Sequence, residues 1–429
     1  MLFSLRLQQF KNFQDATLAL GPLTVIVGTN ASGKSNLRDA FRFLHGMARG
    51  YTLAEILGAK YVEGGVLQWA GIRGGTREVA YQGQTRFTLT TEGKEDEPTD
   101  RKPGFRPILF PYTHTIGVDV GDPGSEPHVV RESLGHWSPI FDSHPQDDRP
   151  AQEGPPYLFV RLPRDERNRR LGKRLRFLDN RPVLSQFAGH REAGKLYRAS
   201  AEECLTTLRS MRFLDLSPEA MKVPSVPGQL VLGDRGENLS SVLQAICKDT
   251  STKSALAAWV RELTPLDVVD FDFVPDQTGR VLLTLIEAGG QRISAHSASD
   301  GTLRFLAMIA ALMGPDAAKF YFLEELDNGI HPTRLHLLLQ LIEQQTRERQ
   351  VQIVTTSHSP QLLAMLSDTA REHASLVYRL AHAPAACIRR VMEIPEIRRV
   401  LAEQNLARLH ESGWLEDALA FTEPEEAVG

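Results

Sequence analysis

The chain has little cysteine and no long apolar run, and each shortage excludes a class of protein. Its 429 residues include only three cysteines, Cys204, Cys247 and Cys387, which lie far apart. Their odd number and spacing argue against a disulfide framework and against a multi-cysteine zinc site. No apolar run approaches the roughly 20 residues of a membrane span, and the first residues lack a secretory-signal pattern. We therefore expect a cytoplasmic protein with no membrane contact.

The chain also lacks an excess of basic charge, since its formal net charge is -4. Any contact with nucleic acid must therefore come from a local patch. One such patch exists between Arg161 and Arg176: Arg161, Arg164, Arg167, Arg169, Arg170, Lys173, Arg174 and Arg176. This cluster could bind DNA phosphates. A solvated helix face and a docking site for an acidic protein are the alternatives.

The remaining composition is that of a large globular protein, with 41% hydrophobic and 24% charged residues. Its pattern changes along the chain and predicts four segments. Strand-like runs fill residues 1–162, helical periodicity fills 163–265, an α/β pattern returns over 266–385, and a short helical tail covers 386–429. No sustained heptad repeat occurs in the helical segment, which argues against a long coiled-coil arm.

Two groups of local patterns predict individual elements. The predicted strands are Phe3–Leu7, Ala16–Leu20, Leu23–Val27, Glu78–Tyr81, Arg86–Thr90, Ile108–Tyr112, Ile116–Val120, Tyr157–Leu162, Val281–Ile286, Arg292–Ser294, Phe320–Leu323 and Gln352–Thr356. The predicted helices are Asn36–Phe43, Glu202–Arg212, Leu239–Ile246, Ser254–Leu263, Thr302–Leu312 and Thr333–Thr346.

The most informative motif lies between the strand at Leu23–Val27 and the helix that follows it. It fits the pattern G-x-x-x-x-G-K-[ST] and consists of Gly28, Thr29, Asn30, Ala31, Ser32, Gly33, Lys34 and Ser35, with Asn36 next. Glycines let the backbone wrap a phosphate, and the helix start adds partial positive charge. Lys34 can reach the β- and γ-phosphates of a nucleotide, and Ser35 can hold Mg²⁺. The motif predicts a nucleotide site.

Four further segments in the last third suit the same chemistry. Glu324 and Glu325 end an apolar strand, where one carboxylate can position a metal and the next can activate a water molecule. His358 follows another buried strand and can reach a γ-phosphate, although a lone histidine is more often structural. Ser299 and Gly301 open an apolar helix, where Ser299 can contact an anion or simply cap the helix. The turn Asn328–Pro332 follows the carboxylates.

Together these segments resemble the ATP-binding-cassette ATPase head, and more narrowly the soluble RecF/SMC/OLD-like group of AAA-family ATPases. The opening FKNF…LTVIVGTNASGKSNLRDA, then SASDGTLRFLAMIAAL, FYFLEELDNGIHP and IVTTSHSPQLL, look like that group's phosphate loop, signature motif, Walker B with D-loop, and switch histidine. MRFLDLSPEAMK and LGDRGENLSSVL look like segments of small AAA ATPases from bacterial defence loci. The resemblance implies an α/β fold, with a P-loop core of the RecA type, an antiparallel β subdomain and an inserted helical subdomain.

The resemblance also implies roles for single residues. ATP and Mg²⁺ would be the cofactors, with Lys34 on the phosphates and Ser35 and Glu324 on the metal. Glu325 would be the general base, and His358 would sense the γ-phosphate. Ser299 and Gly301 would contact ATP bound to a second subunit, and Asp327 and His331 would lie on the dimer seam.

Two positions depart from the family pattern. The Walker B residue is normally aspartate, and Glu324 is one methylene longer, so metal geometry or turnover can differ. The Q-loop has no clear match, and Gln68 is our candidate for it.

Three functions remain open. The first is an ATP-driven, homodimeric sensor or scaffold of a phage-defence system with a separately encoded effector. The second is a RecF-like DNA repair ATPase. The third is the ATPase of a transporter, which the large insert and the degenerate signature disfavour.

Overall fold

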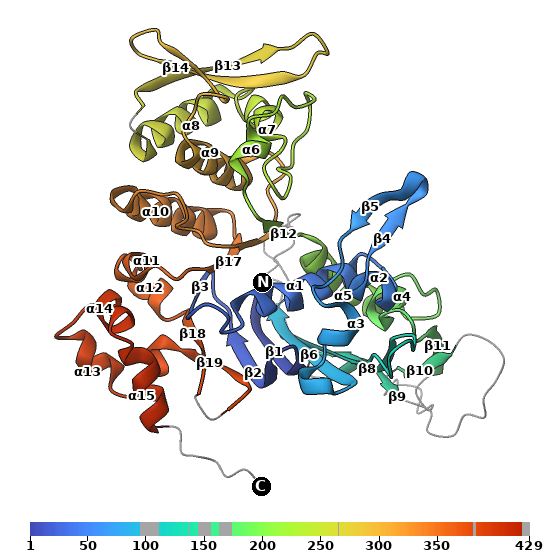
Figure 1. Cartoon of the computed structure of the whole chain (residues 1–429). Coiled ribbons are helices and arrows are strands. Elements are labelled where there is room, and N and C mark those ends of the chain that lie inside the picture. Colours follow the sequence, from blue (N-terminus) through green and yellow to red (C-terminus); the bar gives the residue numbers. More distant parts are fainter. Residues whose placement is uncertain are drawn as a thin grey trace, which may run out of the picture. The chain divides into compact units, whose positions relative to one another are not determined.

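The computed structural model describes residues 1–94, 111–136, 138–144, 156–162, 174–264, 266–380 and 383–422. The chain forms two compact units, each built from several segments (Figure 1). The first unit contains Met1–Gly21, Gly28–Ser210 and Ser375–Arg390, and the second contains Pro22–Val27, Met211–Ala374 and Val391–Gly429. In the described part of the chain, no helix is both long and apolar enough to cross a membrane.

The first unit is built on an eight-stranded sheet with the order β11-β10-β9-β8-β7-β6-β1-β2. Neighbouring strands are antiparallel, and side chains alternate between a buried and an exposed face. On the buried face, Phe141 and Phe177 pack against Phe187 of helix α4, with ring centroids 4.8 and 6.1 Å apart. The strands are β1 Leu2–Phe10, β2 Phe13–Ala19, β6 Arg86–Lys94, β7 Pro111–Asp119, β8 His128–Gly135, β9 Pro139–His144, β10 Tyr157–Arg161 and β11 Arg174–Leu178.

Helices and two hairpins complete this unit. Helix α1 packs on α5, and the hairpin β18–β19 lies against β2. The elements are α1 Lys34–Ala48, α2 Leu53–Leu57, α3 Gly75–Glu78, α4 Val183–Phe187, α5 Lys195–Arg209, and the strands β4 Lys60–Val62, β5 Val66–Trp69, β18 Ala374–Arg379 and β19 Ala386–Arg390.

The second unit contains parallel strands in the order β12-β16-β17-β3. These are β12 Met211–Leu214, β16 Phe320–Leu323, β17 Gln352–Thr356 and β3 Leu23–Val27. Every residue of β3, β16 and β17 is buried, which explains why these strands are mostly apolar. Their carboxyl ends meet at one edge of the sheet, so the segments that follow these strands begin there.

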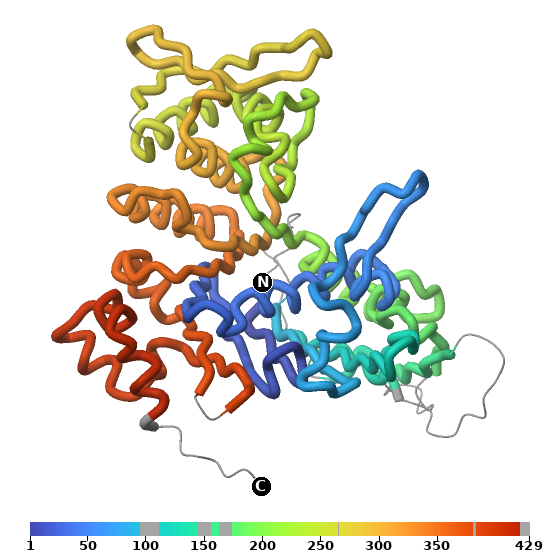
Figure 2. Tube along the Cα trace, in the orientation of Figure 1, coloured from blue at the N-terminus to red at the C-terminus, as the bar shows by residue number. Residues whose placement is uncertain are grey.

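Elsewhere in this unit, a small antiparallel sheet, β13-β14-β15, lies on one side of a group of helices (Figure 2). Helix α7 packs on β14, and α8 packs on α9 and α10. Bounds are β13 Val268–Pro275, β14 Val281–Glu287, β15 Arg292–Ser294, α6 Pro218–Met221, α7 Leu239–Ile246, α8 Thr250–Leu263, α9 Asp300–Met313 and α10 Pro332–Glu348.

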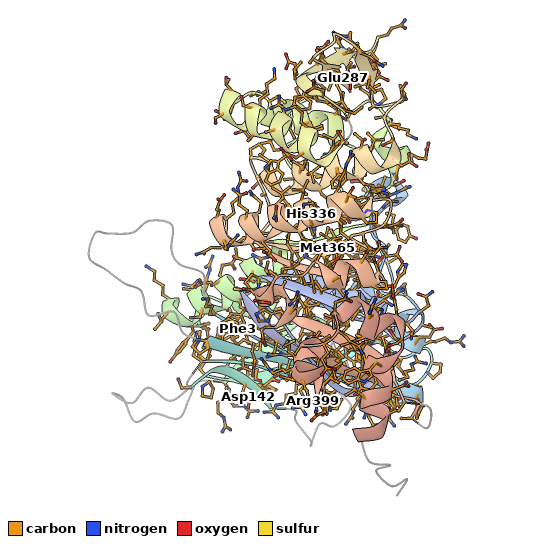
Figure 3. All side chains as sticks on the ribbon, turned by 90° about the vertical axis from the view of Figure 1, so that its left-hand side faces the viewer. Phe3, Asp142, Glu287, His336, Met365 and Arg399 are labelled. Carbon is orange, nitrogen blue, oxygen red and sulfur yellow. The ribbon has the colours of Figure 1, made fainter. Side chains whose placement is uncertain are left out.

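The last helices of the second unit pack onto the region after the parallel strands. Helix α14 contacts both α11 and α15. Figure 3 labels Met365, just after α11, and Arg399 in α13. The helices are α11 Pro360–Ala364, α12 Asp368–Arg371, α13 Ile397–Leu401, α14 Leu406–Glu411 and α15 Trp414–Thr422.

Most predicted elements are present, but two predictions were wrong. Glu78–Tyr81 is not a strand, because Gly74 and Gly75 both have positive φ and turn the chain into the short helix α3. The predicted strand Ile116–Val120 is confirmed as the second half of β7, which begins at Pro111. Of the predicted strand Ile108–Tyr112, residues 108–110 lie outside the described residues and the rest belongs to β7. The helical segment 163–265 also contains β11 and β12, the first of which hides in the basic run. The boundaries at 163, 266 and 386 stay a prediction.

Candidate functional site

The loop after β3 has a backbone that requires glycine at two positions. Gly28 has φ +151° and Gly33 has φ +125°. A Cβ at Gly28 would lie 2.2 Å from the Val377 carbonyl oxygen, and one at Gly33 would lie 2.5 Å from Asn12 Nδ2. Both positions therefore exclude a side chain, and the loop keeps its tight curve into helix α1.

The interior of this loop suits an anion. Lys34 Nζ donates to the carbonyl oxygens of Gly28 at 2.5 Å and Thr29 at 2.9 Å, so the ammonium lies within the loop. The hydroxyl of Ser32 is buried and has no hydrogen-bond partner within the described structure. Helix α1 begins at Lys34, and Gly33 offers no side chain to cap it. A phosphate group at this helix start would satisfy the Ser32 hydroxyl.

Asn12 is a residue of this site that the motif did not reveal. It lies in the turn between β1 and β2, the FKNF segment. Its Nδ2 donates to the Ser32 carbonyl oxygen at 2.9 Å, and its Oδ1 accepts from Asn36 Nδ2 at 2.7 Å. Asn12 therefore links the end of the loop, at Ser32, to Asn36 in the first turn of α1. Asn36 contacts the loop through Asn12.

Arg73 is a second residue that sequence reasoning missed. Its guanidinium donates to the Ser35 carbonyl oxygen at 2.5 Å and pairs with the buried carboxylate of Asp39 at 3.0 Å. Lys11 Nζ lies 3.7 Å from the same carboxylate, and burial lowers the Lys11 pKa while Asp39 opposes that shift. Arg73 is still 57% exposed. It thus adds an accessible cation beside the first turn of α1.

The two carboxylates follow β16 in an unusual backbone conformation. Glu325 has φ +50°, which is uncommon for a residue with a side chain and recurs at functional sites. Its amide donates to Thr356 Oγ1 at 3.1 Å, and its Oε2 accepts from Asn328 Nδ2 at 3.2 Å. These two bonds fix the backbone and the carboxylate, while the side chain is half exposed.

His358 and Asp327 join this group from neighbouring segments. His358 Nδ1 lies 3.9 Å from Glu325 Oε1. Ser357 Oγ donates to Asp327 Oδ1 at 2.7 Å, and the Ser357 amide donates to the Ile26 carbonyl oxygen of β3 at 3.0 Å. The segments after β16 and β17 are therefore bonded to each other at the sheet edge where β3 runs into Gly28.

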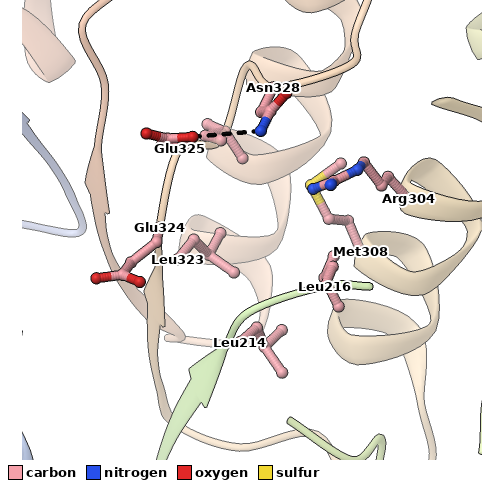
Figure 4. A pocket seen from close by; sticks show the side chains of 9 residues that line it. Leu214, Leu216, Arg304, Met308, Leu323, Glu324, Glu325 and Asn328 are labelled. Carbon is pink, nitrogen blue, oxygen red and sulfur yellow. Dashed lines mark hydrogen bonds between the residues drawn. The ribbon is translucent and has the colours of Figure 1, made fainter. Parts of the chain in front are cut away.

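A small hollow lies behind the carboxylates (Figure 4). In that view the carboxylates of Glu324 and Glu325 point to the same side, away from Met308. The hollow has a cavity volume of about 20 Å³, room for about one water molecule. Its lining residues are Leu214, Leu216, Arg304, Met308, Leu323, Glu324, Glu325, Leu326 and Asn328.

Ser299 is the N-cap of α9, so it stabilises the start of this helix. Its Oγ accepts from the Thr302 amide at 3.1 Å. A Cβ at Gly301 would lie 2.7 Å from the Gly329 carbonyl oxygen, so glycine lets the helix start approach the turn after the carboxylates. Ser299 is exposed, which leaves its hydroxyl accessible.

The other predicted residues have different surroundings. His331 is the N-cap of α10, and Gln68 is an exposed residue of β5. Of the basic cluster, Arg161, Arg174 and Arg176 are described and exposed. The remaining members, Arg164, Arg167, Arg169, Arg170 and Lys173, lie outside the described residues.

Comparison with known proteins gives a family match. Residues 23–98 and 136–364, more than half of the chain, match the family described as "AAA domain, putative AbiEii toxin, Type IV TA system". The chain belongs to this AAA family.

Several known proteins are similar to parts or most of the chain. An ATP/GTP phosphatase from Helicobacter pylori is 21% identical over 87% of this chain and 89% of its own length. The DNA replication and repair protein RecF of Anaeromyxobacter is 30% identical, over 33% of this chain and 40% of its own length. The solved Smc head bound to the C-terminal winged-helix domain of ScpA covers 90% of this chain and 97% of its own, at 12% identity and a TM-score of 0.46.

The family match and the phosphate loop assign the chain to the P-loop ATPases of the AAA family, with an α/β fold. The predicted AAA family, α/β fold class and ATPase activity are confirmed.

Proposed function

We propose that the protein binds Mg²⁺–ATP, dimerises on it and hydrolyses it. The observation that carries the proposal is the shared sheet edge, where β3 leads to Gly28, β16 to Glu324 and β17 to Ser357. In P-loop ATPases the nucleotide lies at such an edge.

Each residue would have a distinct task. Lys34 and the loop amides bind the β- and γ-phosphates, and Ser35 and Glu324 would hold Mg²⁺, which neutralises phosphate charge when bound. Glu325, held by Asn328 and Thr356, accepts a proton from the attacking water molecule. His358, 3.9 Å from Glu325, donates toward the γ-phosphate.

In the proposed dimer, a second copy of the chain completes each nucleotide site, which we call the composite site. The exposed hydroxyl of Ser299 and the start of helix α9 would bind the γ-phosphate held by a second copy. Asp327 and His331 would lie at the same seam.

Ser299→Arg tests the composite site. We expect monomers to bind ATP about as well as wild type, because Ser299 serves another copy's nucleotide. ATP-driven dimerisation, followed by sedimentation, and ATP hydrolysis should both fall at least about tenfold, since a bulky cation would occupy the γ-phosphate position. Ser299→Ala is the matched control for loss of the helix cap alone. A Ser299→Arg protein that dimerises and turns over like wild type would reduce Ser299 to a helix cap.

We further propose a cytoplasmic role in antiviral defence, with a separately encoded effector. The description of the matched family as a toxin of a toxin–antitoxin system supports a role beside a genetically linked partner. Copurification with the product of a neighbouring gene, with and without ATP, tests this role.

DNA binding is the second candidate, favoured by the outer face of β10 and β11. The Arg176 guanidinium lies 3.3 Å from the ring centroid of Tyr157, and the Arg174 guanidinium lies 4.5 Å from that of Phe159. Arg161 lies directly opposite Arg174. Arginine–aromatic surfaces of this kind bind single-stranded nucleic acid by stacking and charge.

Charge reversal tests this second candidate. We expect Arg174→Glu with Arg176→Glu to weaken binding of single-stranded DNA at low salt by more than about tenfold. Arg398→Glu with Arg399→Glu, on helix α13, is the matched control. Equal binding by both double variants, measured by fluorescence anisotropy, would rule out this face.

A further inference from the structure

The hairpin β4–β5 presents an apolar tip to solvent in the first unit (Figure 1). Tyr61 is 63% exposed, Val62 41%, Val66 62% and Leu67 50%. A two-stranded hairpin on its own is marginally stable, and clustered exposed apolar side chains mark contact sites. Four large apolar residues at one tip are therefore unusual unless another surface covers them.

The base of this hairpin is firmly held. Trp69 is buried, its indole nitrogen donates to the Ile56 carbonyl oxygen at 3.1 Å, and the Arg42 guanidinium lies 4.7 Å from its ring centroid. Lys60 pairs with Glu55 at 2.9 Å. A rigid base with an exposed tip is preorganised for docking.

The hairpin also stands beside the phosphate loop. Arg42, stacked on Trp69, belongs to α1, the helix that begins at Lys34. Arg73, four residues after the hairpin ends, donates to the Ser35 carbonyl oxygen. The hairpin therefore projects from the part of the first unit that holds the phosphate loop.

A second exposed apolar surface flanks the other half of the proposed site, within the second unit. Val223 is 49% exposed and Val226 is 53% exposed. The residue before Val223, Lys222, pairs with Asp300 at 3.2 Å, at the start of α9. Ser225 hydrogen-bonds with Val281 through both backbone groups. Residues 223–227 carry no charge. The exposed surface that follows Lys222 is therefore apolar, and Lys222 ties its first residue to the start of α9.

We infer that the β4–β5 tip of one copy packs on the Val223–Val226 surface of a second copy when the two share ATP. This inference rests on the proposed dimer, in which the phosphate loop of one copy faces Ser299 of the other. Each surface flanks one of these two elements, so docking them brings an apolar tip to an apolar surface. Two-fold symmetry would form the contact twice in each dimer. The occupant is thus a second copy of this chain.

Charge argues against nucleic acid as the occupant. The hairpin residues 60–69 carry one basic side chain, Lys60, and one acidic side chain, Glu63. Lys60 is already paired with Glu55. A surface without free positive charge offers nothing to phosphates.

The first test removes the apolar tip. In a Glu325→Gln background, where ATP should accumulate the dimer, we expect Val66→Ser with Leu67→Ser to raise the dimer dissociation constant about 10- to 100-fold. ATP binding by monomers should not change, because neither residue belongs to the nucleotide site. Leu196→Ser, at an exposed apolar residue of α5, is the matched control. Analytical ultracentrifugation with ATP measures all three proteins.

The second test locates the contact by cross-linking. One protein carries Leu67→Cys and another Val226→Cys, both with Cys247→Ala and Cys387→Ala. We expect an oxidised species of double mass only in the mixture and only with ATP, which excludes a bond within one copy. Val269→Cys in place of Val226→Cys should give no such species.

The outcomes separate this inference from the proposed function. Weaker dimers together with the specific cross-link support it. If the tip substitutions leave the dissociation constant of the Glu325→Gln dimer unchanged and no cross-link forms, the docking of the two surfaces is wrong and the ATP-bound dimer stands. Absence of any ATP-dependent dimer overturns both.

Discussion

Replacing Lys34 with alanine is expected to abolish ATP binding. Lys34 places its ammonium group inside the phosphate loop, where it donates to the carbonyl oxygens of Gly28 and Thr29. With ATP bound, those hydrogen bonds would pass to phosphate oxygens, and charge-assisted bonds of this kind are among the strongest in proteins. The loss should weaken binding at least about 100-fold.

Calorimetry with Mg²⁺–ATP measures this effect. Lys248→Ala, at an exposed lysine after α7, removes the same charge elsewhere and should leave affinity unchanged. Wild-type ATP affinity in the Lys34→Ala protein would contradict the assignment of the nucleotide site to the phosphate loop.

Replacing Glu325 with glutamine is expected to slow ATP hydrolysis by about 10²- to 10⁴-fold while ATP still binds. Glutamine can keep the bond that Glu325 accepts from Asn328, so the local structure is preserved. It cannot accept a proton from water, so the ATP-bound dimer should accumulate.

Glu324→Gln is the comparison that assigns the two carboxylates. If Glu324 holds Mg²⁺, this change should weaken the dependence of ATP binding on Mg²⁺. Tight Mg²⁺–ATP binding with lost turnover in Glu324→Gln, and near-normal turnover in Glu325→Gln, would exchange their roles.

The parts of the fold that the sequence predicted well have strong local signals. The strands β16 and β17 were predicted with their observed bounds, because short apolar runs between polar segments favour buried parallel strands. Helix α9 was predicted from Thr302 and begins at Asp300, where Ser299 caps it. The phosphate loop needed no tertiary information, because its glycines and lysine are consecutive in the chain.

The features that could not be predicted from the sequence depend on contacts between residues far apart in the chain. Strand β11 alternates arginine with buried Leu175 and Phe177, and that pattern within a basic run was interpreted as helix. Asn12 and Arg73 join the site from 20 residues before Ser32 and 38 residues after Ser35. The positive φ of Glu325 could not be predicted either, since its amide bonds to Thr356, which is 31 residues away in the sequence.

The central claim, a nucleotide site shared between two copies, is tested most directly by mixing two inactive proteins. In a two-fold dimer of Ser299→Arg with Lys34→Ala, one site carries both substitutions and the other carries neither. We predict that the ATPase activity of the mixture rises well above that of either protein alone, toward about a quarter of the wild-type rate if one intact site can act by itself. Activity in the mixture equal to the average of the two separate proteins would contradict a shared site.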